Sequence, residues 1–268
     1  MIVFVLFIFL IGTIIYSTLL YLFLHKKTHI SLKYLYKDNI INILLSFTMI
    51  CVVSFLIILP TWLYYIILFA TVPSMCVLIS ALRFYRIPLR KVNAKENEIV
   101  SPADGNIIYI KKIESGEIPI SVKNGVSAKL SEFANTGILD YPCWLIGINM
   151  TPFDVHRNAA PLDGKIILNK HFDGEFLSLK HQDALVRNER NTIVLDTKIG
   201  KVGVVQTASR LVRRIVTYKK EGDKLQKGEW FGMIKFGSQV DLIIPASCTI
   251  NVNLKDQVYA KKTIIANI

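Results

Sequence analysis

Two long stretches without a charged side chain constrain the fold of this sequence most strongly. Residues 1–24 contain no Asp, Glu, Lys or Arg, and neither do residues 39–82. A helix needs roughly 20 apolar residues to cross a bilayer, so the first stretch can supply one span and the second can supply two, with Pro60 between them. The sequence therefore predicts a membrane region over residues 1–82, with helices at about 2–24, 40–59 and 61–82.

A cleaved signal peptide is the alternative interpretation of the first stretch. Signal sequences place an apolar segment of about 7–15 residues after a basic region and before a cleavage site made of small residues. Here the apolar residues begin at Ile2, continue to Leu24 and are followed by no such site. We therefore expect a retained helix.

The basic residues beside these helices predict the orientation of the chain. Three spans would put the first loop and the segment after the last span on the same side, whereas two spans would put them on opposite sides. Both segments are basic, and short cytoplasmic segments are enriched in Lys and Arg. We therefore expect three spans in the cell (inner) membrane, with the large domain on the cytoplasmic side. The basic residues are Lys26, Lys27, Lys33 and Lys37 in the loop, and Arg83, Arg86, Arg90 and Lys91 after the last span.

The net charge of +12 suggests an acidic partner. For a tethered domain this partner is most simply the anionic membrane surface, where each basic residue contributes about 1 kcal/mol. The sequence has no zinc-finger spacing and no aromatic-basic nucleic-acid motif, so we expect no nucleic-acid partner. The four cysteines and five histidines also lack the spacing of a metal site, and we expect no metal.

The rest of the chain has the pattern of a β protein. Residues 83–98 form a polar connector, and residues 99–268 contain short β-branched runs separated by Gly, Asn and Asp, which predict a mainly β, compact, sandwich-like or barrel-like domain. Gly222 and Gly228 stand where hairpin turns need a positive φ, as in biotinyl-type and lipoyl-type sandwiches. The runs expected to be strands are 106–110, 144–148, 164–168, 192–196, 202–206, 213–218 and 241–244.

Three short motifs in this domain carry a family resemblance. They are Ser101–Gly105 (SPADG), Phe153–His156 (FDVH) and the pair Gly237-Ser238. Each alone has a structural interpretation, as a turn or a packed histidine. In this order and at these separations they resemble the phosphatidylserine decarboxylase proenzymes, most closely the short, prokaryotic-type branch, over about residues 83–268.

The resemblance implies that the chain cuts itself between Gly237 and Ser238. The Ser238 hydroxyl attacks the Gly237 carbonyl and turns the amide into an ester. β-Elimination then leaves dehydroalanine at position 238, and its hydrolysis gives a pyruvoyl group, the enzyme's cofactor. The products are chains 1–237 and 238–268, which stay together as a heterodimer. The sequence leaves open whether the mature enzyme forms a homo-oligomer.

The implied reaction is the conversion of phosphatidylserine to phosphatidylethanolamine. The pyruvoyl ketone reacts with the amine of the serine headgroup and provides the electron sink as CO2 leaves. Archaetidylserine or another serine phospholipid is an equal candidate, because the headgroup chemistry is the same. A non-catalytic, membrane-tethered β-sandwich adaptor is the alternative from a different class. An esterase using Ser238 has less support, since no Gly-x-Ser-x-Gly motif is present.

The resemblance also assigns residues. Asp104 matches the aspartate that supports self-cleavage, and His156 matches the histidine of the decarboxylation step, where imidazole is suited to proton transfer; Asp154 is a candidate for orienting it. Arg213 and Arg214 are candidates for binding the substrate phosphodiester, or else a solvated pair.

Two positions depart from the family pattern. Ala159 stands where the longer branch has a second histidine, so the base for self-cleavage is left open: His156 serves both steps, or Asp104 activates Ser238 directly or through water. Gln239 stands where short-branch members often have arginine, and we expect a weaker contact to an anionic group of the substrate there.

Overall fold

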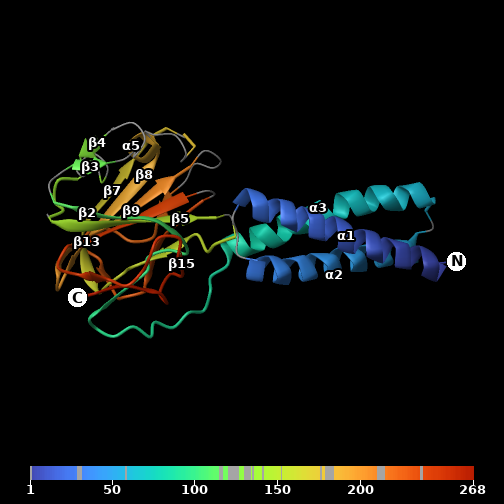
Figure 1. Ribbon diagram of the computed structural model, residues 1–268, viewed down its shortest axis with the longest axis horizontal. Coiled ribbons are helices and arrows are strands. Elements are labelled where there is room, and N and C mark those ends of the chain that lie inside the picture. Colours follow the sequence, from blue (N-terminus) through green and yellow to red (C-terminus); the bar gives the residue numbers. More distant parts are fainter. Residues whose placement is uncertain are drawn as a thin grey trace. The chain divides into compact units, whose positions relative to one another are not determined.

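The computed structural model of the protein describes most of the chain. Two units are distinguished within it, Met1–Arg86 and Ile87–Ile268, and both are drawn in Figure 1. The described residues are 2–28, 32–57, 59–114, 117–119, 127–129, 134, 136–140, 142–151, 153–175, 177–178, 184–209, 215–235 and 238–268.

Three apolar helices form the first unit (Figure 1). Each contains a segment long and apolar enough to cross a membrane. Helices suit that environment because every main-chain polar group is satisfied within the segment. The expectation of apolar helices ahead of a β-rich domain is confirmed. The helices are α1 (Ile2–Thr28), α2 (Leu32–Leu56) and α3 (Thr61–Tyr85), and the candidate spans within them are Leu6–Lys27, Tyr36–Leu56 and Trp62–Tyr85.

Helix α2 begins at Leu32, earlier than the expected start near residue 40, and therefore contains Asp38. The charge is accommodated because the Asp38 carboxylate is buried and lies 2.5 Å from the Arg83 guanidinium of α3. A second polar contact joins α1 to α2, where Ser17 Oγ donates to Asn39 Oδ1 at 2.6 Å. Paired polar side chains of this kind hold helices together where the surroundings are apolar.

The second unit is built on an eight-stranded antiparallel sheet that curls into a half-barrel (Figure 1). Its strands, in spatial order, are β11 (Lys224–Leu225), β7 (Gly164–Phe172), β8 (Arg190–Thr197), β9 (Gly200–Ala208), β13 (Ser238–Pro245), β5 (Cys143–Met150), β2 (Gly105–Ile113) and β15 (Gln257–Val258). All seven runs expected to be strands lie wholly or partly in strands, and the β-rich fold class is confirmed.

Smaller sheets complete this unit. One has the order β1 (Glu98–Val100), β16 (Ile264–Asn267), β14 (Thr249–Ile250), and another has the order β10 (Ile215–Thr217), β12 (Trp230–Ile234), β6 (Arg157–Ala159). The remaining elements are the hairpin of β3 (Glu117–Pro119) and β4 (Ser127–Lys129), and the short helix α5 (Ala184–Arg187). Gly222 and Gly228 have φ of 92° and 77°, which confirms the turns expected there.

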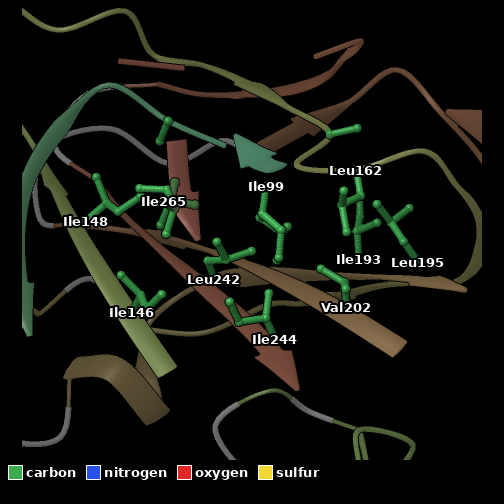
Figure 2. Packing of buried hydrophobic residues seen from close by; sticks show 14 of the residues in the cluster. Ile99, Ile146, Ile148, Leu162, Ile193, Leu195, Val202, Leu242, Ile244 and Ile265 are labelled. Atoms are coloured by element: carbon green, nitrogen blue, oxygen red, sulfur yellow. The ribbon is translucent and has the colours of Figure 1, made fainter. Parts of the chain in front are cut away.

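The main core lies on one face of the large sheet. Side chains alternate between faces along a strand, so Leu242 and Ile244 of β13 join this core, whereas Ile243 joins a smaller cluster on the opposite face. Figure 2 shows Leu242 and Ile244 beside Ile99 of β1 and Ile265, a residue of β16. Burying each such side chain contributes about 1.5–3 kcal/mol, so the large sheet and the small sheets stabilise one another.

Candidate active site

Strand β13 begins at Ser238, the residue expected to become the cofactor. The backbone of Ser238 pairs with Met150 of β5 on one side and with Ala208 of β9 on the other. Residue 238 is therefore held by two neighbouring strands. Three other predicted residues, Gly237, Arg213 and Arg214, lie outside the described residues.

The end of β5 brings Asp154 to this edge of the sheet. Met150 is the last residue of β5, and the chain turns immediately after it. Both the main-chain N–H and the hydroxyl of Thr151 donate to Asp154 Oδ2 at 2.7 Å. These bonds fix the turn, and because Met150 pairs with Ser238, the turn follows directly beside the start of β13.

His156 is fully buried at the end of this turn. Its Nδ1 lies 2.9 Å from the main-chain carbonyl oxygen of Asp154; since a carbonyl only accepts, Nδ1 carries the proton. The main-chain N–H of Ile234 donates to the His156 carbonyl at 3.0 Å and ties the residue to β12. Asp154 thus orients the imidazole through its main chain, and its carboxylate bonds to Thr151 instead.

Burial sets the protonation of both side chains. It lowers the pKa of His156 to about 4, so the imidazole is neutral near pH 7. Burial also raises the pKa of Asp154. The nearby charge of Asp104 raises this pKa further, whereas the hydrogen bonds from Thr151 lower it. His156 can therefore act as a proton acceptor first, and as a donor only after it has taken up a proton.

Asp104 lies just before β2 and is held by an arginine of the connector. Arg90 Nη1 and Nη2 lie 2.5 and 2.7 Å from its two carboxylate oxygens, and the main-chain N–H of Ala260 donates at 2.8 Å. Such a bidentate pair is the geometry in which a guanidinium binds a carboxylate best. Sequence reasoning missed Arg90, because a basic residue in a polar connector has no distinctive pattern.

A glycine makes the position of Asp104 possible. Gly105 has a φ of 150°, and a Cβ atom there would lie 2.3 Å from the carbonyl oxygen of Asn149. The Asp-Gly pair thus lets β2 approach β5 closely. Across the sheet, Asn106, Asn149 and Gln239 are in register.

Asp104, Asp154 and the start of β13 therefore meet at one edge of three adjacent strands. Neighbouring strands are spaced about 4.8 Å apart, so the starts of β2 and β13, which flank β5, lie roughly 10 Å from one another. His156 lies in the turn between Asp154 and β6. The arrangement combines a serine at a strand start, a buried neutral imidazole and two carboxylates, and it can support nucleophilic attack and proton transfer.

The side chain of Gln239 lies inside the β unit. Its Nε2 donates to the Tyr109 hydroxyl at 2.7 Å and lies 3.0 Å from each oxygen of Asp241. Tyr109 also donates to Asp241. Gln239 is 3% exposed and Asp241 is fully buried, so Gln239 belongs to an internal network and not to a surface that contacts an anionic substrate.

The Asp241 network is a second feature that the sequence did not indicate. Burial raises the pKa of Asp241 to about 7, although bonds from Tyr109 and Gln239 and the charge of Lys111 oppose the rise. Gly147 makes room for the tyrosine, because a Cβ there would lie 2.5 Å from its ring. The network joins β2, β5 and β13 beside residue 238.

Comparison with known proteins identifies the family. A sequence model described as phosphatidylserine decarboxylase matches residues 78–266. The chain belongs to the phosphatidylserine decarboxylase family. It is accordingly a decarboxylase, a carboxy-lyase, and the match includes Asp104, Asp154, His156 and Ser238.

Relatives in this phosphatidylserine decarboxylase family come from archaea and bacteria. A Methanocaldococcus jannaschii protein with the provisional name archaetidylserine decarboxylase proenzyme is 40% identical over 191 residues, which are 70% of this chain and 90% of that protein. The phosphatidylserine decarboxylase proenzyme of Geotalea uraniireducens is 36% identical over 68% of this chain and 76% of its own length. That of Burkholderia lata is 34% identical over 73% and 82%.

Proposed function

We propose that this protein is a membrane-anchored, pyruvoyl-dependent decarboxylase that converts phosphatidylserine to phosphatidylethanolamine and CO2 after it has cut itself between Gly237 and Ser238. One observation carries the proposal. The serine that would be processed begins a strand paired on both sides, at the edge of the sheet where Asp104, Asp154 and the His156 turn meet.

Self-cleavage requires that the serine stay in place when the peptide bond before it is broken. Ser238 Oγ attacks the carbonyl carbon of Gly237, the peptide nitrogen leaves, and an ester forms. Elimination of that ester releases residue 237 as a carboxylate and leaves dehydroalanine at residue 238. Addition of water and loss of ammonia then convert the dehydroalanine into the pyruvoyl group. The ladders to Met150 and Ala208 would hold residue 238 in place throughout, so the strand start fits a pyruvoyl group.

His156 is a better candidate than Asp104 for the base in this step. Arg90 and the Ala260 N–H occupy both oxygens of Asp104, which favours a structural and electrostatic role for that carboxylate. His156 is neutral near pH 7 and can accept a proton. Since Ala159 replaces the second histidine of the longer branch, His156 would serve both self-cleavage and decarboxylation.

In the decarboxylation step a pyruvoyl carbonyl supplies the electron sink for loss of CO2. The chain's own residues supply orientation and proton transfer. His156, its Nδ1 proton held by the Asp154 carbonyl, would take up a proton from water and donate it to the α-carbon that has lost CO2.

The membrane region supports a lipid substrate. The chain continues from α3, which ends at Tyr85, into the β unit, which starts at Ile87, so the catalytic unit is covalently tethered to the apolar helices. We infer from the basic loop and connector that the unit lies on the cytoplasmic side of the cell membrane. Arg213 and Arg214 are our candidates for the substrate phosphodiester.

Carbon dioxide release from defined vesicles tests the function. Purified full-length protein is mixed with vesicles in which the serine carboxyl of the lipid is labelled, with diacyl and isoprenoid-ether tails compared in parallel. The wild type should release labelled CO2, and Ser238→Ala, which cannot form a pyruvoyl group, should release none. Release by the alanine variant would refute the pyruvoyl assignment, and an uncut, inactive wild type would favour the adaptor.

A further inference from the structure

A file of hydrogen-bonded side-chain amides, half-buried at Asn169 and buried at Asn191, Gln206 and Asn158, runs through the β unit toward the site. Asn169 Nδ2 donates to the main-chain carbonyl of Lys219 at 2.8 Å, and Asn191 Nδ2 donates to Asn169 Oδ1 at 3.0 Å. Asn191 Nδ2 also lies 3.5 Å from Gln206 Oε1, and Gln206 Nε2 donates to Asn158 Oδ1 at 2.7 Å. The file therefore ends at Asn158.

The direction of every bond in this file is fixed by its first member. A main-chain carbonyl can only accept, so Asn169 must present its Nδ2 to Lys219 and its Oδ1 to the next amide. Each following amide likewise accepts through its oxygen or donates through its nitrogen, as its neighbour requires. The oxygen of Asn158 is therefore occupied by the donor of Gln206. Its Nδ2 then carries two N–H donors, for which the described residues provide no acceptor.

An unpaired donor in such a position is costly. Asn158 and Gln206 are fully buried, and Asn191 is 2% exposed. Most buried polar groups in folded proteins have a partner, and one without it lowers stability noticeably. A rigidly oriented donor without a protein acceptor is therefore expected to bind an acceptor that a ligand brings.

The donor lies beside the proposed reaction centre. Asn158 follows His156 by two residues, and alternate residues of extended chain share a side. Gln206 pairs with Val240, two positions along β13 from Ser238. A Cβ at Gly232 would lie 3.1 Å from Gln206 Nε2, so the glycine leaves room for this amide between the sheets.

We propose that Asn158 Nδ2 binds the carboxylate of the serine headgroup, an inference that rests on the proposed function. A carboxylate that leaves water for the buried surroundings of Asn158 needs a hydrogen-bond donor. The ethanolamine product has lost it as CO2. Asn158 therefore distinguishes substrate from product, and the product leaves the site with one contact fewer.

Two lipids that cannot be decarboxylated separate this contact from the rest of the site. Dihexanoyl phosphatidyl-3-hydroxypropionate has the carboxylate but no amine, and dihexanoyl phosphatidylethanolamine has the amine but no carboxylate. Their binding to the full-length protein in detergent micelles is measured by calorimetry for the wild type, Asn158→Ala and Asn158→Asp. Because a hydrogen bond to a charged group is lost, Asn158→Ala should weaken binding of the carboxylate lipid about tenfold or more, and binding of phosphatidylethanolamine less than twofold.

A matched control is available in Asn188, which is equally buried. Its Nδ2 donates to the carbonyls of Leu177 and Ala208, so Asn188→Ala removes a partnered amide and should leave the ratio of the two affinities unchanged. Asn158→Asp keeps the oxygen that Gln206 needs, repels a carboxylate, and serves as the test where the alanine variant unfolds. Equal effects on both lipids would overturn the inference.

Failure of the inference can be told from failure of the proposed function. The same preparations are assayed for self-cleavage and for CO2 release. Suppose that the wild type is cut and active and that both Asn158 variants keep the affinity ratio of the wild type. Only the role proposed for Asn158 is then refuted. If the wild type is uncut and inactive, the proposed function itself is refuted.

Discussion

The buried carboxylate of Asp241 gives the sharpest test of the energetics. Burial raises its pKa from 3.8 to about 7, so the folded protein binds a proton at this position that the unfolded chain has released over this range. Ionising the group therefore destabilises the fold, and the penalty grows as the pH rises from about 4 to 7. Asp241→Asn cannot ionise and should not show this loss.

The size of the effect follows from the interval between the two pKa values. Each pH unit corresponds to about 1.4 kcal/mol, so the full penalty is on the order of 4 kcal/mol. Between pH 5 and pH 8 the wild type should lose roughly 2–3 kcal/mol relative to Asp241→Asn. In a unit of this size that corresponds to about 5–10 °C in melting temperature.

Thermal unfolding in detergent at a series of pH values measures this difference. Wild type and Asp241→Asn share every other titrating group, so the change in their Tm difference between pH 5 and pH 8 isolates Asp241. The wild type should become less stable than the variant, or lose its advantage over it, as the pH rises. A Tm difference that stays constant between pH 5 and pH 8 would refute the reasoning.

Three further substitutions test the site. His156→Ala should fold, remain largely uncut and lose at least about 10²–10⁴-fold in CO2 release; normal cutting would remove its role in self-cleavage, and a rate within a few-fold of the wild type would remove its role in proton transfer. Gly105→Ala should lower the free energy of unfolding by about 3 kcal/mol or more, because its Cβ would lie 2.3 Å from the Asn149 carbonyl oxygen; an unchanged denaturation midpoint would contradict this. Arg90→Met leaves Asp104, whose side chain is 2% exposed, without its counter-charge and should cost about 3–5 kcal/mol. Chemical denaturation measures that loss, and a variant as stable as the wild type would show that the pair is dispensable.

Local patterns in the sequence predict the elements of this fold well. Uncharged stretches predict the helices, and β-branched runs predict the strands, because both depend on side chains close together in the chain. The start of α2 was not predicted. Asp38 interrupts the apolar pattern, and only its pairing with Arg83 of another helix makes a helical position acceptable.

The candidate site was predicted in part. Asp104, Asp154 and His156 belong to short motifs and could be named from the sequence. Single residues that pair with a partner far away in the sequence could not be predicted. Asn158 meets Gln206 only through the order of the strands, and Tyr109 meets Asp241 across 132 residues.

Mass spectrometry of the purified, full-length protein is the most direct measurement. It should find two polypeptides, ending at Gly237 and beginning at residue 238, with the smaller one lacking an α-amino group and resisting N-terminal sequencing. Recovery of one continuous polypeptide of 268 residues with serine at position 238 would contradict the account.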